Sequence, residues 1–188
     1  MAFLYSTKLR KITLTILLIW ASVFFWFLSG QLVVNIIIVF ASMMCLGAIL
    51  SDQNTHYTTI YLSFLTAYVL YGYTSVNNLP TWLIMAGVLV IYLYLFANLE
   101  QKMEFITGQR LIYLFIFALL SLETFIFLSY FIISPINRSL ILAMVVYTIC
   151  GFCDSIISQK KPKLMLSYLL VFLIVFVTML LTAAWGQI

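Results

Sequence analysis

Glu123 is the residue of this chain whose type and position most clearly indicate chemistry. It lies within the apolar stretch 111–133, LIYLFIFALLSLETFIFLSYFII, and it is the only charged residue of that stretch. Moving a carboxylate into the middle of a bilayer costs about 2.5–3.5 kcal/mol on insertion scales, so such a group normally has a partner or a function. Glu123 therefore predicts either a proton, cation or substrate site, or a polar contact that joins two helices.

Hydroxyl groups at a similar predicted depth are the candidate partners of Glu123. Tyr68 lies near the middle of an earlier apolar stretch, and Tyr147 and Thr148 lie near the middle of a later one. A buried tyrosine hydroxyl requires a hydrogen-bond partner. We therefore expect Glu123 to contact Tyr68 or Tyr147 inside the protein. The alternative for Tyr68 is aromatic packing, because tyrosine is also common at membrane interfaces.

Three cysteines form a second candidate group. Cys150 and Cys153 have C-x-x-C spacing, which is found in redox pairs and in metal sites. Cys45 follows Met43 and Met44 and is expected at a similar depth, so thiols and thioethers together could bind Cu(I). The alternative is that these cysteines are small apolar residues that allow close helix packing. Because no histidine lies at that depth, we expect neither a bound metal nor a cofactor.

Asp154 is a further acidic residue within an apolar stretch. It follows Cys150 by one helical turn and lies nearer to the basic residues Lys160 and Lys161 than Glu123 does. This position indicates contact with the membrane interface, or alternatively a residue further along the same pathway as Glu123.

Catalytic motifs are not recognisable in this sequence. It contains no Walker loop, no H-E-x-x-H pair and no G-x-S-x-G turn with a partner histidine. The sequence therefore favours a role that is not enzymatic.

The composition indicates where the chain resides. Of its 188 residues, 65% are hydrophobic and only 7% are charged, whereas charged residues make up about 25% of an ordinary soluble domain. A soluble protein of this size requires a polar surface, so the expected surroundings are a bilayer. The excess of nine Lys and Arg over five Asp and Glu is small. We expect membrane lipids as partners and no nucleic acid.

Seven apolar stretches are long enough to cross a bilayer, which requires about 20 residues each. Their continuous hydrophobicity predicts helices, because the strands of a membrane barrel alternate in character. All three prolines lie in connecting segments or at a helix start. We predict an all-α, polytopic transmembrane bundle as a single domain over residues 1–188, with helices at 12–29, 31–50, 58–75, 80–98, 111–133, 139–158 and 164–185.

The basic residues predict the orientation of this bundle. If the N-terminus is cytoplasmic, eight of the nine Lys and Arg residues lie in cytoplasmic segments, and only Arg138 lies outside. Basic residues are enriched on the cytoplasmic side of membrane proteins. We therefore predict a multi-pass protein of the inner (plasma) membrane, with its N-terminus cytoplasmic and its C-terminus outside.

Residues 123–151, ETFIFLSYFIISPINRSLILAMVVYTICG, resemble a segment of uncharacterised multi-pass bacterial membrane proteins. In those families an intramembrane glutamate is followed by an aromatic-rich helix end, a turn that contains proline, and another span. The resemblance implies a bacterial inner membrane and implies no particular chemistry.

Three functional hypotheses follow from these features. The first is a non-catalytic membrane subunit or scaffold that packs against another membrane protein, with Glu123 as a buried carboxyl that joins helices. The alternative is a small transporter or proton-coupled protein in which Glu123 titrates or contacts the ligand. A third, which the sequence supports less, is a thiol-based membrane enzyme that uses Cys150 and Cys153.

Overall fold

The computed structural model describes residues 7–53, 55–76, 80–100, 107–131, 133–157 and 163–182. Within these ranges every element is a helix, which confirms the predicted all-α class. The helices are α1 (Thr7–Ser29), α2 (Leu32–Ser51), α3 (Thr55–Val76), α4 (Thr81–Glu100), α5 (Thr107–Ser129), α6 (Pro135–Ile157) and α7 (Lys163–Thr182).

Five segments of the described chain are long and apolar enough to cross a membrane, which indicates a membrane protein. Helices suit this environment because they satisfy their own backbone hydrogen bonds where no water is present. The five segments are Thr7–Ser29, Leu32–Ser51, Trp82–Leu99, Leu111–Ser129 and Pro135–Phe152.

The helix ends around the last predicted outer turn differ from expectation. The predicted span 111–133 extends beyond the helix, because α5 ends at Ser129. The next helix begins at Pro135, four residues before the predicted start at 139. Proline is well tolerated at the first position of a helix, where its missing N–H has no intrahelical partner. Hydropathy alone cannot locate these ends, since the apolar run continues through Phe131 and Ile133 past the end of α5, whereas the first turn of α6 contains the polar residues Asn137 and Arg138.

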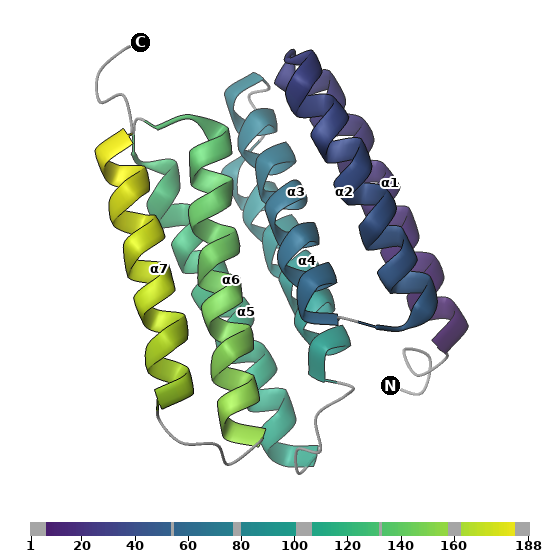
Figure 1. The fold of residues 1–188 in the computed structure, drawn as a ribbon, viewed down its shortest axis with the longest axis vertical. Coiled ribbons are helices and arrows are strands. Elements are labelled where there is room, and N and C mark those ends of the chain that lie inside the picture. Colours follow the sequence, from purple (N-terminus) through teal and green to yellow (C-terminus); the bar gives the residue numbers. More distant parts are fainter. Residues whose placement is uncertain are drawn as a thin grey trace.

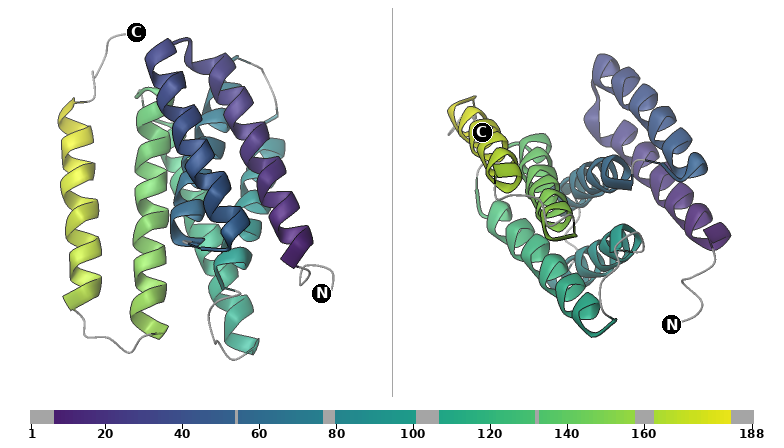
Figure 2. Two further views of the ribbon diagram at one scale, coloured as in Figure 1. Left: turned by 45° about the vertical axis from the view of Figure 1, so that its right-hand side comes forward. Right: turned by 60° about the horizontal axis from the view of Figure 1, so that its bottom comes forward.

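The central helix of the bundle is α3. It packs against α1, α2, α4 and α6, and successive helices run in alternating directions (Figure 1). At one edge α1 and α2 lie together, and at the opposite edge α7 packs mainly against α6 (Figure 2). A further edge is formed by α5, whose neighbours are α4 and α6. Among the described helices, none packs closely on the remaining face of α5.

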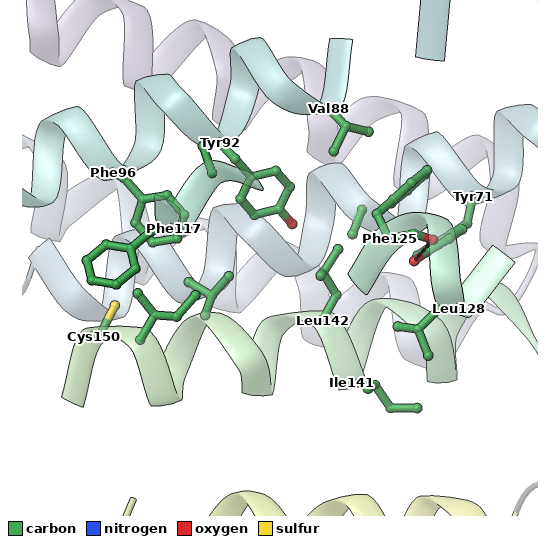
Figure 3. Close-up of a cluster of buried hydrophobic side chains, with 14 of the residues drawn as sticks. Tyr71, Val88, Tyr92, Phe96, Phe117, Phe125, Leu128, Ile141, Leu142 and Cys150 are labelled. Carbon is green, nitrogen blue, oxygen red and sulfur yellow. Dashed lines mark hydrogen bonds between the residues drawn. The ribbon is translucent and has the colours of Figure 1, made fainter. Parts of the chain in front are cut away.

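Two clusters of buried side chains meet at α3. The first lies among α3, α4, α5 and α6, with Tyr71 and Phe125 near one end and Phe117 and Cys150 near the other (Figure 3). The second joins α1 and α2 to α3 and α4, and its fully buried members include Phe25 and Cys45. Because α3 contributes to both clusters, it links the two halves of the bundle.

The contact between α6 and α7 depends on a glycine. A Cβ atom placed on Gly151 would lie 2.3 Å from Cγ of the Tyr168 ring. No real side chain tolerates such a distance, so glycine at this position permits the close approach of α7. The Tyr168 ring also packs against Tyr147, with ring centroids 4.9 Å apart.

Candidate functional site

Glu123 lies on the outward face of α5. Its side chain is exposed in the single chain, so the prediction that surrounding helices bury it is wrong. The inward face of α5 is occupied by Phe117, Ser121 and Phe125, which are buried at intervals of four residues. Two residues correspond to a rotation of about 200° around a helix, so Glu123 points away from the side on which Ser121 lies.

The face around Glu123 is otherwise apolar or aromatic. Ile116 and Leu120 precede it, Phe127 and Tyr130 follow it, and all four side chains are exposed. Their spacing of three or four residues places them along one side of the helix. Within the part of the chain that the structure describes, the Glu123 carboxyl forms no hydrogen bond or ion pair.

The residues expected to contact Glu123 form contacts with other residues instead. Tyr68 is only 8% exposed, and its ring packs against Phe25 of α1 with centroids 4.2 Å apart. Tyr147 packs against α7, and the Thr148 hydroxyl donates to the carbonyl of Met144 in its own helix at 2.9 Å. Neither tyrosine is thus brought to Glu123. The similar predicted depths of these residues in the membrane do not show which neighbouring helix each side chain faces.

The structure separates the described cysteines. Cys45 belongs to the cluster formed with α1, and Cys150 belongs to the cluster that includes α5. The side chains of Met43 and Met44 point outward and are exposed, although Cys45 beside them is buried. Both described cysteine side chains pack among apolar residues, and among described residues no three His, Cys, Asp or Glu side chains gather as metal ligands would. The side chains of Cys153 and Asp154 lie outside those that the structure describes.

A pocket of about 360 Å³ lies where α3 and α5 end and α4 and α6 begin. None of its residues is predicted from the sequence to bind a ligand, although Arg138 is the single basic residue at the predicted outer side. The pocket combines one guanidinium and three hydroxyl groups with apolar side chains. It is lined by Arg138, Thr74, Ser129, Tyr130, Ile84, Met85, Phe125 and Ile126.

Two contacts hold the guanidinium of Arg138 at this pocket. Its Nη2 donates to the carbonyl of Phe131 at 2.6 Å, and its central carbon lies 5.6 Å from the centroid of the Tyr71 ring. Tyr71 is itself fixed, since its hydroxyl donates to the carbonyl of Phe125 at 3.1 Å and the two rings stack (Figure 3). The Nε of Arg138 is buried and has no hydrogen-bond partner within the described residues.

The opposite end of the bundle contains a different polar cluster. Arg10 of α1 is only 7% exposed and forms an ion pair with Asp52, which follows α2. Lys11 donates to the carbonyl of Leu50 at 2.7 Å, and the hydroxyls of Thr13 and Tyr94 form a hydrogen bond. The space beside Arg10 is only about 10 Å³, which suits a single water molecule. These contacts hold α1 against α2 and α4, so this cluster is structural.

No family model, curated protein or solved structure matches the chain. The resemblance of residues 123–151 to uncharacterised bacterial families therefore stays a prediction. The transport hypothesis also stays a prediction, and Glu123 is not among the residues that line the pocket at Arg138. The exposed face of α5 and this pocket are the two features from which a function can be inferred.

Proposed function

We propose that the chain is a non-catalytic membrane subunit that binds a transmembrane helix of another membrane protein through the outward face of α5. In the complex, the Glu123 carboxyl accepts a hydrogen bond from a donor on the partner helix. The observation that carries this proposal is the exposure of Glu123 well inside the apolar segment Leu111–Ser129.

The Glu123 carboxyl requires a hydrogen-bond donor if it is to lie inside a bilayer. Lipid chains offer no hydrogen bonds, and a charged group facing them costs about 2.5–3.5 kcal/mol or more. Helices in membranes meet this cost through hydrogen bonds to polar side chains of neighbouring helices. Within the described chain no such group reaches Glu123, and we therefore assign the donor to a partner helix.

The shape of the surface supports a helical partner. Ile112, Ile116, Leu120, Phe127 and Tyr130 form a stripe of exposed large side chains that includes Glu123. An adjacent helix can pack along such a stripe, with van der Waals contacts above and below the polar group.

The chemistry of Glu123 favours a different protein over a second copy of this chain. A two-fold contact through this face would present the same residue from both copies. Two carboxylates at one contact repel each other, whereas an arginine, lysine, serine or asparagine on a different helix complements the carboxyl.

We further propose that all seven helices span a bacterial inner membrane, with the N-terminus cytoplasmic. Each helix contains at least 20 residues, the length that a span requires. The basic side chains Lys8, Arg10 and Lys11 lie at one end of the bundle and Arg138 lies at the other (Figure 1). This distribution agrees with the usual enrichment of basic residues on the cytoplasmic side.

Photo-crosslinking in native membranes tests the proposed interface. A photoreactive phenylalanine analogue replaces Phe127, which is 59% exposed beside Glu123, or, as a matched control, Phe40 of α2, which is 65% exposed. We expect a specific adduct with a different membrane protein from position 127 only, and we expect Glu123→Leu to abolish it. Glu123→Gln should retain part of the adduct, because its amide can still form a hydrogen bond.

Two results would contradict this proposal. Equal labelling from both positions would mean that the α5 face is not specific. An adduct of twice the 21.6 kDa chain mass as the sole product would identify a second copy as the occupant, and would overturn the assignment of a different partner.

A further inference from the structure

The pocket at Arg138 has the size and lining of a ligand site. Its volume of about 360 Å³ lies within the range of about 300–1,000 Å³ that is common for small-molecule pockets. It lies at the ends of four helices, the level at which lipid head groups meet a membrane-spanning bundle. One part of its lining is apolar and another part carries a positive charge, so a matching ligand is amphiphilic.

The positive charge of Arg138 is not compensated by the described part of the chain. The ion pair found there joins Arg10 to Asp52 at the other end of the bundle. A guanidinium has five N–H donors. One of them is used by the carbonyl of Phe131, and Nε has no partner among the described residues. Because Nε is buried, the donors that remain for an anion are the other N–H groups of the guanidinium.

The position of the guanidinium is set before any ligand binds. The Phe131 carbonyl holds one edge, and the Tyr71 ring lies against the group at 5.6 Å. A fixed side chain loses little conformational entropy when it binds a ligand. Arg138 also lies in the first turn of α6, a helix of 23 residues, whose N-terminal end favours negative charge.

The hydroxyl groups that line the pocket indicate which kind of anion it can bind. Thr74 and Ser129 donate to the carbonyls of Tyr71 and Phe125 in their own helices, at 2.7 and 2.8 Å. Of the three hydroxyl groups in the pocket, that of Tyr130 therefore donates no hydrogen bond to another described residue. Arg138 and Tyr130 together suit the oxygens of a phosphate, which an arginine binds with two parallel hydrogen bonds.

We propose that this pocket binds an anionic phospholipid, with its phosphate at Arg138 and Tyr130 and its first acyl carbons against Ile84, Met85 and Ile126. A zwitterionic head group is disfavoured, because its own cation competes for the phosphate and lies near the guanidinium. Glu123 does not line this pocket, although Tyr130 belongs both to the pocket and to the partner surface.

Native mass spectrometry of the purified full chain tests the proposal. The probes are phosphatidylglycerol, phosphatidylcholine, palmitate and inorganic phosphate, each added to delipidated protein in detergent micelles. We expect the anionic phospholipid to be retained about ten-fold better than the zwitterionic one, because both carry the phosphate but the anionic lipid has no cation of its own near the guanidinium. Arg138→Gln should remove this preference, whereas Lys8→Gln, which changes an exposed lysine on α1, should leave it unchanged.

A second variant keeps the test decisive if Arg138→Gln does not fold. Met85→Trp fills the pocket from α4 and leaves the charge in place, so it should reduce retention of phosphatidylglycerol. Binding that is equal for wild type and both pocket variants would overturn the site. If palmitate is retained in preference to phosphatidylglycerol, the assignment of a phosphate group to the pocket is wrong. If inorganic phosphate alone saturates the pocket, the ligand is not a phospholipid.

Discussion

At the scale of single residues, two charged side chains have environments that their positions in the sequence do not reveal. Glu123 lies within an apolar segment and is exposed, whereas Arg10, from the basic N-terminal segment, is buried against Asp52. We propose that the first is satisfied by a partner helix. The second depends on a residue 42 positions away.

The Arg10–Asp52 ion pair should contribute to stability. Asp52→Ala removes one partner of a buried guanidinium, so we expect the free energy of unfolding to fall by about 1–3 kcal/mol. Asp52→Asn should have a smaller effect, because its amide oxygen still accepts a hydrogen bond. Thermal unfolding in detergent measures both variants, and Gln53→Ala, which changes the exposed neighbouring residue, is the control. Equal stability of all three variants would mean that the pair is not stabilising.

At the scale of elements, α5 and α7 are peripheral helices that are attached to the bundle in different ways. The inward side of α5 carries a continuous set of buried side chains and packs on α4 and α6. In contrast, α7 packs mainly on α6, with Tyr168 over Gly151. Without a hydrophobic force between helices in lipid, such close contacts are what hold a peripheral helix in place.

Gly151→Ala should weaken the attachment of α7. The new methyl group would meet the Tyr168 ring at 2.3 Å, and overpacking of this kind costs about 1–3 kcal/mol. The matched control is Gly47→Ala on α2, whose added Cβ would have nothing within 4 Å. Faster proteolysis within α7 in the first variant alone is the expected readout. Adding Tyr168→Ala should restore resistance, and a failure to do so would show that the ring is not the obstacle.

At the scale of the whole molecule, α3 connects two groups of helices. One of its sides packs with α1 and α2, and another packs with α6. Charged groups lie at the two ends of the bundle, with the Arg10–Asp52 pair at one and the Arg138 pocket at the other. Between the ends the buried polar groups include hydroxyls such as Ser63 with Tyr92, and of the described acidic side chains it is Glu123 that lies there.

The proposed orientation gives a prediction for the whole molecule. In bacterial cells, a phosphatase reporter fused after residue 188 should be active, because it would be exported, and the same reporter fused after residue 53 should be inactive. The physical reason is the retention of Lys8, Arg10 and Lys11 on the cytoplasmic side. Activity of the fusion after residue 53 would contradict this orientation.

Much of the fold was predictable from the sequence. Apolar runs of about 20 residues require helices in a bilayer, and seven helices are found in the described ranges. Gly30 separates the predicted spans 12–29 and 31–50, and it has a φ of 60°, which few other residues tolerate. The depth of Glu123 along its helix also follows from counting residues.

The direction in which each side chain points was decided only by the tertiary structure. All faces of these helices are apolar, so no hydrophobic periodicity separates the packed face from the lipid face. Glu123 could therefore be placed at a depth but not on a face, and Tyr68 and Tyr147 could not be separated from it. The pocket at Arg138 combines residues from four helices, and only the packing of those helices brings them together.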